Sequence, residues 1–335
     1  MSTFYIPTGY TPRLSLYETQ TAIGQIKQMF PEKLALALNL RRVSAPLFVE
    51  PHTGLNDDLN GTETPVSFAI TETGSPVQIV HSLAKWKRMA LHRYGFPMGQ
   101  GLYTDMNAIR ADEELGNLHS VYVDQWDWEK IIDPTQRTMV TLHAAAQDIV
   151  TATCDTAEAL AALYPALELN LCRRAHILTT QELADQFPGL TPKERENAAL
   201  KQYRTVVLTQ IGGPLRDGTP HDGRAPDYDD WQLNADILFY CDVLDCALEI
   251  SSMGIRVSPA SLDAQLTAAG CDHRRTLPFH ASLLAGELPL TMGGGIGQSR
   301  LCMLLLQKAH IGEVQVSVWD AATHKACEHA GVPLL

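Results

Sequence analysis

Residues 233–251, LNADILFYCDVLDCALEIS, are typical of two antiparallel strands joined by a tight turn. A turn at Asp242–Val243 would pair Asp236 with Glu249 on one face of this hairpin. Neighbouring side chains of a strand point to opposite faces, so a slip of one residue would bury both acids, and this favours the register. The other face is then wholly apolar and carries Ile237, Phe239 and Cys241 against Leu244, Cys246 and Leu248.

The paired acids of this hairpin suggest a metal site. Asp236 and Glu249 would repel each other unless a cation lies between them, because like charges directly opposite in a sheet are destabilising. Carboxylate oxygens are the ligands that Mg²⁺ prefers, so the pair predicts a magnesium site. The spacing alone equally allows a polar sheet face that is exposed to solvent.

The segments on both sides of the hairpin mix helices with strands without strict alternation. This pattern favours an α+β fold, an antiparallel β-sheet flanked by helices, over a doubly wound parallel sheet. No linker rich in Pro, Gly or Ser interrupts the chain, so we expect a single domain over residues 1–335. We expect helices at 15–38 (one or two, interrupted at Pro31), 83–94, 136–163 and 180–202 (two, around Pro188 and Pro192), and strands at 42–50, 76–83, 118–128 and 205–211.

Composition limits the class of protein. The net charge of −12 argues against a protein that binds nucleic acid, because such proteins are usually basic. The sequence contains neither an apolar stretch long enough to span a membrane nor a signal peptide, so we expect no membrane partner. The seven cysteines include no C-x-x-C pair, which favours reduced thiols and a cytoplasmic protein.

The glycine-rich stretch TMGGGIGQSR, residues 291–300, leads directly into the apolar segment LCMLLL. It lacks the Lys-Ser/Thr of a phosphate-binding P-loop and the glycine spacing of a dinucleotide-binding turn. The spacing that is present is G-x-G-x-G-x-x-R, from Gly293 to Arg300. Glycine allows a ligand to approach the backbone closely. The stretch therefore predicts either a nucleotide site with Arg300 at the start of a helix, or an ordinary strand-to-helix turn.

Three further segments combine charged and polar side chains. Gln125 and Asp127 continue the apolar face of a predicted strand, which indicates a cleft or the end of the strand in solvent. Residues 81–88 hold three cations, typical of a solvated helix face or of anion capture at a helix start. Residues 224–231 contain three aspartates, which lie either in a surface loop or in part of a ligand site.

Taken together, these and longer runs resemble the ammonia-dependent asparagine synthetases, the aspartate–ammonia ligase family, which is related to the class II aminoacyl-tRNA synthetases. The resemblance extends from about residue 55 to residue 320 and is more specific than any single motif. Within the wider class, AIRADE resembles the second signature motif and the glycine–arginine stretch the third. The runs are IVHSLAKWKR (79–88), GLYTDMNAIRADE (101–113), LHSVYVDQWDWE (118–129), RAPDYDDW (224–231), LEISSMGIRV (248–257) and GGGIGQSRLCMLLLQ (293–307).

The resemblance implies a class II synthetase-like catalytic core in a homodimer. It implies that ATP activates the β-carboxylate of L-aspartate as β-aspartyl-AMP with release of pyrophosphate. Ammonia would then displace AMP and yield L-asparagine. The ligands that the resemblance implies are therefore ATP, Mg²⁺, L-aspartate and ammonia.

The resemblance also implies a role for each matched position. Arg110 would hold the α-phosphate, and on chemical grounds Asp57 and Gln125 suit the reacting carboxyl. The sequence does not identify the base for ammonium, and Asp57 is our candidate. The aspartate pocket would consist of Asp57, Lys87, Gln125, Asp127, Asp229 and Arg256. The nucleotide would contact Arg110, Glu113, Ser120, Asp236, Glu249, Ser252, Gly295 and Arg300, with Asp236 and Glu249 also at the metal.

Two other functions compete with the ligase. The first is an aminoacyl-tRNA synthetase or a paralogue that modifies a macromolecule, and the acidic charge and the lack of an appended anticodon-binding domain argue against it. The second is an inactive binding subunit, and the intact site positions argue against it. The chain departs from the family pattern in its first 50 residues, at a shortened segment around Gln232 and in its tail. We expect glutamine to be a weak nitrogen donor, because no amide-hydrolysing domain is visible.

Overall fold

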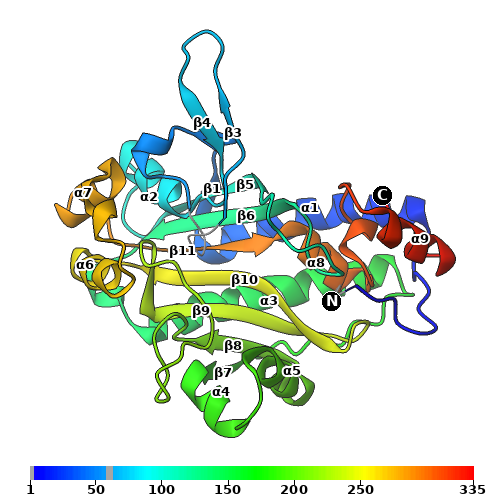
Figure 1. Cartoon of the computed structure of the whole chain (residues 1–335). Coiled ribbons are helices and arrows are strands. Elements are labelled where there is room, and N and C mark those ends of the chain that lie inside the picture. The colour runs from blue at the N-terminus through cyan, green and yellow to red at the C-terminus, as the bar shows by residue number, and fades with distance from the viewer. Residues whose placement is uncertain (1–3, 58–62) are drawn as a thin grey trace.

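The computed structural model describes residues 4–57 and 63–335, and an eight-stranded sheet with helices on both faces forms its centre (Figure 1). The strand order is β1-β5-β6-β11-β10-β9-β8-β7. Only the outermost pairs, β1 with β5 and β7 with β8, run parallel, so the predicted α+β architecture around a mainly antiparallel sheet is confirmed. The strands are β1 (Leu40–Arg42), β5 (Gly101–Ile109), β6 (Tyr122–Ile131), β7 (His176–Thr179), β8 (Thr205–Thr209), β9 (Asp229–Cys241), β10 (Cys246–Arg256) and β11 (Thr291–Gly297).

The helices divide between the two faces of the sheet. Helices α1 (Leu16–Leu38) and α3 (Met139–Leu163) pack against each other behind the strands in Figure 1. Helices α4 (Thr180–Gln186) and α5 (Pro192–Tyr203) cover the opposite face at the β7–β8 end. No helix among the described residues is long and apolar enough to cross a membrane. The remaining helices are α2 (Ala84–Arg93), α6 (Pro259–Ala268), α7 (Pro278–Leu284), α8 (Gln298–Leu305) and α9 (Ala321–His329).

Helix boundaries follow the local sequence signals with one exception. Separate helices α4 and α5 are confirmed, and each begins with a capping box, at Thr179 and at Thr191. The expected interruption of the first helix at Pro31 is wrong, because α1 continues through this residue to Leu38. A proline in a helix removes one backbone hydrogen bond. The complete burial of Phe30 and Leu34 on either side offsets this cost.

The β9–β10 hairpin is confirmed, but its predicted register is wrong. Asp236 pairs with Ser252, and Glu249 pairs with Leu238. The difference arises because the turn occupies residues 242–245 instead of two residues, and because the pairing is irregular between Glu249 and Ser251. Strand alternation still brings Asp236 and Glu249 to the same face, as the sequence predicted.

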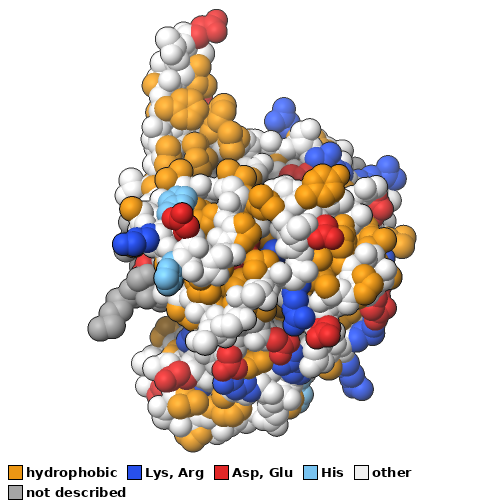
Figure 2. All heavy atoms as spheres, turned by 90° about the vertical axis from the view of Figure 1, so that its right-hand side faces the viewer, with side chains coloured by type: hydrophobic (Ala, Val, Ile, Leu, Met, Phe, Trp, Pro, Cys, Tyr) orange, Lys and Arg blue, Asp and Glu red, His pale blue; other side chains and the backbone are white. Residues whose placement is uncertain are grey.

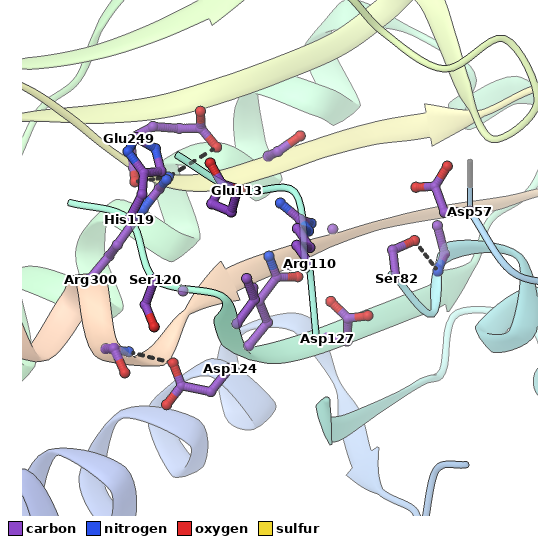
Figure 3. A pocket seen from close by; sticks show the side chains of 18 of the residues that line it. Asp57, Ser82, Arg110, Glu113, His119, Ser120, Asp124, Asp127, Glu249 and Arg300 are labelled. Atoms are coloured by element: carbon purple, nitrogen blue, oxygen red, sulfur yellow. Dashed lines mark hydrogen bonds and ion pairs between the residues drawn. The ribbon is translucent and has the colours of Figure 1, made fainter. Parts of the chain in front are cut away.

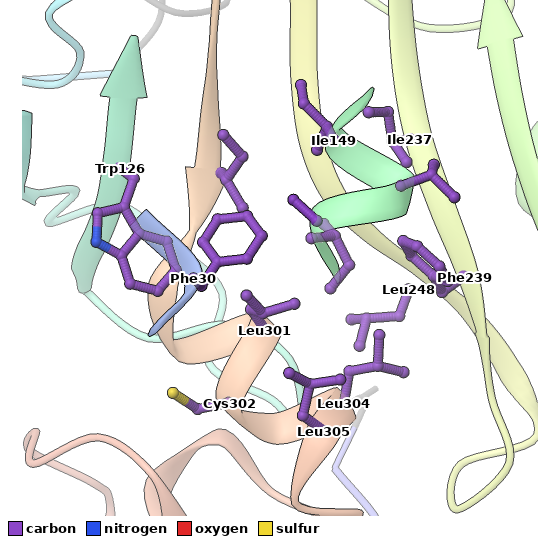
Figure 4. Close-up of a cluster of buried hydrophobic side chains, with 14 of the residues drawn as sticks. Phe30, Trp126, Ile149, Ile237, Phe239, Leu248, Leu301, Cys302, Leu304 and Leu305 are labelled. Atoms are coloured by element: carbon purple, nitrogen blue, oxygen red, sulfur yellow. The ribbon is translucent and has the colours of Figure 1, made fainter. Parts of the chain in front are cut away.

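Side chains of the central strands alternate between a dry core and the opposite face. On β6, Trp126 and Trp128 are buried in the core, and the Trp126 ring lies 4.8 Å from that of Phe30. Figure 4 shows Trp126 and Phe30 beside side chains from α8 and the β9–β10 hairpin, including Leu301 and Phe239. The intervening residues of β6 point away from this core, so one sheet face remains for polar chemistry.

A second sheet, of order β2-β4-β3, forms an arm that projects from the body of the molecule (Figure 1). Its strands are β2 (Phe48–Val49), β3 (Ser67–Ala69) and β4 (Pro76–Ile79), so the strands expected at 42–50 and 76–83 are shorter than predicted. Phe48 and Phe68 meet edge to face with ring centroids 5.3 Å apart. Figure 2 shows hydrophobic side chains gathered along this arm.

Candidate active site

A cavity of about 420 Å³ lies over the polar face of the central strands (Figure 3). Strand pairing aligns Asp127, Gly295, Ser252 and Asp236 in one row across β6, β11, β10 and β9. Every site residue expected from the sequence lines this cavity except Asp236. Asp236 lines an adjoining cavity of about 330 Å³, and Glu249 lines both. The fold therefore brings the predicted residues together, whereas their individual roles stay predictions.

The glycines of β11 leave room for side chains of the neighbouring strands. A Cβ atom on Gly295 would lie 2.6 Å from Asp127 Oδ1, and one on Gly293 would lie 2.7 Å from Arg256 Nη2. Both distances are shorter than real Cβ contacts, so a side chain at either position would displace Asp127 or Arg256. Helix α8 begins at Gln298, directly after β11, so Arg300 lies in its first turn. Both features expected of this stretch, a bare backbone and an arginine at a helix start, are confirmed.

Lys87 and Asp127 form the floor at one end of the cavity. The Lys87 ammonium is buried, donates to the carbonyl oxygen of Gly294 at 2.8 Å and lies 3.5 Å from Asp127 Oδ2. Burial lowers the pKa of Lys87, and the Asp127 carboxylate opposes this shift. A cation without full compensation therefore faces the space where an anionic ligand could bind.

Ion pairs fix the arginines beside this floor. Arg256 donates from Nη2 to Glu129 Oε2 at 2.8 Å and also pairs with Asp229. Arg224 connects two aspartates: its Nε atom lies 3.1 Å from Asp229 Oδ2, and its Nη1 atom lies 2.9 Å from Asp236 Oδ1. These pairs run continuously from β6 to β9, so Asp229 belongs to the site. All three aspartates of residues 224–231 are buried, so a surface loop is wrong.

Asp57 lies at the same end of the cavity as Asp127 and Ser82 in Figure 3. Its backbone N–H donates to the side chain of Asn56 at 3.0 Å, and its carbonyl oxygen lies 3.0 Å from Nδ1 of His81. Asp57 as a whole is 2% exposed. Local contacts thus fix the segment that carries this carboxylate.

Arg110 lies between the two ends of the cavity in Figure 3. It follows β5 in a turn in which Glu113 N–H donates to the Arg110 carbonyl, so these two residues are not on a helix. The guanidinium donates only a 3.4 Å hydrogen bond, to the carbonyl of His81, and pairs with no carboxylate in the ranges 4–57 and 63–335. An arginine with spare donors at a cavity wall is suited to bind an anion.

The other end of the cavity carries Arg300, Glu249 and His119, which cluster in Figure 3. Arg300 Nη1 donates to the Glu249 carbonyl at 3.2 Å and lies 3.9 Å from its Oε1 atom. Burial lowers the pKa of His119 to about 4, and the positive charges of Arg300, Lys193 and Arg110 add to this effect. His119 is therefore a neutral imidazole at neutral pH.

The predicted metal pair lines one cavity but is incomplete as an all-protein site. Burial raises the pKa of Asp236 to about 7; Arg224 opposes the shift and the Glu249 carboxylate adds to it. Such a destabilised carboxylate favours a nearby cation. Among the described residues, no three His, Cys, Asp or Glu side chains are grouped to hold a metal ion. A divalent ion here would therefore need ligands from a bound phosphate or from water.

Sequence reasoning missed a second layer of residues behind the cavity. Buried Asp227 accepts from Lys85 Nζ at 3.2 Å and from Arg274 at 3.0 Å, and it lies 2.9 Å from His280 Nε2. Together with Lys87, this shows that the cations of residues 81–88 are buried, so a solvated helix face is wrong. Six further residues line or support the cavity although no motif pointed to a role for them: Ser82, His119, Asp124, Glu129, Arg224 and Tyr228.

Known structures share the fold of this chain. The asparaginyl-tRNA synthetase of Entamoeba histolytica, in complex with asparaginyl-adenylate, matches with a TM-score of 0.64 at 12% identity, over 90% of this chain and 66% of that chain. The asparaginyl-tRNA synthetase of Pyrococcus horikoshii, also with asparaginyl-adenylate, matches with a TM-score of 0.57 at 15% identity, over 94% and 74%. At such low identity these matches establish the class II synthetase fold alone.

Comparison of the amino-acid sequence with known families identifies this protein more specifically than the shared fold does. The family model for aspartate–ammonia ligase matches residues 17–331. The aspartate–ammonia ligases of Clostridium perfringens and Ruminiclostridium cellulolyticum are each 55% identical over 100% of both sequences. That of Levilactobacillus brevis is 54% identical over 98% of this chain and 99% of its own length. The chain therefore belongs to the aspartate–ammonia ligase family.

Proposed function

We propose that this enzyme makes L-asparagine from L-aspartate, ammonia and ATP through a β-aspartyl-AMP intermediate, with AMP and pyrophosphate as products. Membership of the ligase family supports the overall reaction. The observation that carries the mechanism is the position of Arg110, whose guanidinium has no carboxylate partner among the described residues and lines the cavity between Asp57 and Asp127 at one end and Arg300 and Glu249 at the other. An adenylation reaction needs a cation at this junction.

In the first step, an oxygen of the aspartate β-carboxylate attacks the α-phosphorus of ATP, and the bond to the β-phosphate breaks. Two anions must meet, so Arg110 at the α-phosphate and Lys87 near the carboxylate would lower the barrier by electrostatic stabilisation. Asp127 and Asp229 suit the α-ammonium of aspartate, and Gln125 can donate its amide to the reacting carboxyl. Holding both substrates in this geometry removes much of the entropic cost of their encounter.

The nucleotide would occupy the end of the cavity that carries Arg300. Its guanidinium can stack on or clamp the nucleotide over the bare backbone of Gly295, because the planar group suits both contacts. Glu113 would lie on the adenine side, with Ser120 and Ser252 as hydrogen-bond partners. All four side chains line the same cavity, which supports this assignment.

Asp236 and Glu249 would hold Mg²⁺ together with phosphate oxygens and water. Their shared sheet face and the raised pKa of Asp236 fit a cation between them. When bound, the ion would neutralise charge on the phosphates. Arg224, which pairs with both Asp229 and Asp236, would keep the metal end and the aspartate end in a fixed relation.

In the second step, the nitrogen of ammonia attacks the β-carbonyl carbon, and the bond to the AMP oxygen breaks. Ammonium must first lose a proton, and we propose Asp57 as its acceptor. The carboxylate lines the aspartate end of the cavity and is held by the fixed segment around Asn56. Arg110 would stabilise the departing phosphate of AMP in this step.

Exchange of pyrophosphate into ATP tests this function directly. We expect exchange that depends on L-aspartate and needs no RNA, because the adenylate forms from free aspartate. The net charge of −12 agrees with the absence of a nucleic-acid substrate. Labelled pyrophosphate is incubated with enzyme, ATP and Mg²⁺, with and without aspartate, and label in ATP is counted. An absolute requirement for tRNA would instead indicate an aminoacyl-tRNA synthetase.

The ligase is further proposed to be a cytoplasmic homodimer. All seven cysteines are free thiols, which suits a reducing compartment. Leu36 and Tyr17, near opposite ends of α1, are 87% and 83% exposed, and a dimer interface along this helix would cover both. We expect light scattering to give twice the 36.8 kDa mass of one chain. A mass of one chain at micromolar concentration would contradict the dimer.

A further inference from the structure

Residues 4–10, here called the N-terminal strap, lie beside the tip of the β9–β10 hairpin in Figure 1 and form neither helix nor strand. No step of the mechanism so far uses them. Their hydrogen bonds reach three separate segments: the loop 110–121 between β5 and β6, the hairpin turn 242–245, and the residues that follow α8. The strap therefore connects parts of the chain that are distant in sequence.

Asn117 joins the strap to the loop 110–121 through its side-chain amide. Its Oδ1 atom accepts from the backbone N–H of Tyr5 at 2.9 Å, and its Nδ2 atom donates to the Tyr5 carbonyl at 2.7 Å. The same Nδ2 atom donates to the carbonyl of Ala309 at 2.7 Å. Asn117 is 4% exposed, so water competes little for these hydrogen bonds. One amide thus connects the loop to the strap and to the segment after α8.

Asn117 lies directly behind the wall of the main cavity. Leu118 and His119, the next residues of the loop, line this cavity, and so does Arg110 at the start of the loop. The Asn117 carbonyl accepts from the backbone N–H of Ile311 at 2.8 Å, and Ile311 lines the cavity as well. The position of Asn117 therefore determines where the loop presents its side chains to the nucleotide end.

The other contacts of the strap fix it to the body of the protein. The Tyr5 hydroxyl donates to the Leu244 carbonyl at 2.5 Å, in the turn of the hairpin that carries the proposed metal acids. The Tyr10 hydroxyl donates to Glu313 Oε2 at 2.9 Å. A loop without such supports samples many conformations, and a ligand must then supply the free energy that orders it. The strap removes part of this cost before the nucleotide binds.

We propose that Asn117 is a positioning residue for nucleotide binding, which acts with the strap to hold the loop 110–121 in its binding conformation. This inference rests on the proposed function. If the loop adopts that conformation in only a fraction of the molecules, the apparent affinity for the nucleotide falls by the same fraction. The aspartate end is independent of the strap, because Lys87, Asp127 and Arg256 lie on α2, β6 and β10.

Binding of AMP and of L-aspartate to the Asn117→Ala enzyme tests this role, with each ligand titrated separately by calorimetry. We expect about tenfold weaker binding of AMP and unchanged binding of L-aspartate. Tyr5→Phe removes only the hydroxyl bond to Leu244 and should weaken AMP binding about threefold. In the Asn117→Ala background the strap is already released from the loop, so Tyr5→Phe should have no further effect.

Asn234→Ala is the matched control for a general loss of stability. Asn234 is 0% exposed, and its amide forms the same reciprocal pair with a backbone, accepting from Ile211 N–H at 2.9 Å and donating to the Ile211 carbonyl at 2.8 Å. Its thermal unfolding midpoint should fall about as far as that of Asn117→Ala, with unchanged AMP binding. Tyr94→Phe is the control for Tyr5→Phe, since these tyrosines are 49% and 48% exposed.

Unchanged AMP affinity in Asn117→Ala, or equal weakening of AMP and L-aspartate, would overturn the assignment. If Asn117→Ala does not fold, Tyr5→Phe decides, because unchanged AMP binding in that variant overturns the assignment equally. Additive effects of the two substitutions would refute the coupling of strap and loop. These measurements need no turnover, so failure of the wild-type enzyme to make asparagine would refute the proposed function separately.

Discussion

Arg110→Ala is expected to lower aspartate-dependent exchange of pyrophosphate into ATP by a factor on the order of 10² or more. The guanidinium is the group best able to neutralise the α-phosphate as the β-carboxylate attacks it. Within residues 4–57 and 63–335 its side chain makes a single long hydrogen bond, at 3.4 Å, so the fold should lose little stability. Exchange rates and the thermal unfolding midpoint are measured on the same preparation.

Arg173→Ala provides the control for this variant. Arg173 forms ion pairs with Asp155 and Glu158 on the exposed surface, away from the cavity. The Arg173→Ala enzyme should therefore exchange pyrophosphate at the wild-type rate. Normal turnover by Arg110→Ala would contradict the role of Arg110. A large loss of stability in that variant would show that the arginine is structural.

Arg256→Leu is expected to cause the largest loss of stability, about 3–5 kcal/mol in the free energy of unfolding. The substitution leaves Glu129 and Asp229 buried without their shared cation, and these side chains are 0% and 1% exposed. Urea unfolding followed by tryptophan fluorescence measures the effect, because Trp126 and Trp128 lie on the same strand as Glu129.

Arg275→Leu is a matched control for the buried arginine. Arg275 also pairs with two carboxylates, Asp263 and Asp272, but at the surface, so little change in stability is expected. Equal unfolding midpoints for the two variants would show that the buried network contributes no more than surface pairs do. The buried ion pairs would then not form a fixed frame under the substrates.

The sequence predicted those features that depend on local alternation. Period-two patterning assigned Asp236 and Glu249 to one face of the hairpin, and the same rule brings Gln125 and Asp127 to the cavity. Extending the alternation by two residues would have identified Glu129 as well. The register was wrong because the length of a turn and the position of an irregularity depend on how both strands pack, which local spacing does not specify.

Other features depend on contacts between distant segments. Asp227 meets Lys85 and His280, which lie far away in the chain, so no local pattern could show that these charges are buried together. His119 and Arg224 line the cavity, but no local pattern distinguishes them from other polar residues of the sequence. The expected interruption at Pro31 is wrong because only the cost of proline can be read from the local sequence. The burial that compensates this cost depends on tertiary contacts.

The central claim is that the β-carboxylate of aspartate attacks the α-phosphorus of ATP in this cavity. Aspartate labelled with ¹⁸O in the β-carboxylate tests it, because the oxygen that bonds to phosphorus leaves with AMP when ammonia attacks. Mass spectrometry of the products should find one ¹⁸O atom in AMP and none in pyrophosphate. Unlabelled AMP, or label in inorganic phosphate with ADP as the nucleotide product, would contradict the account.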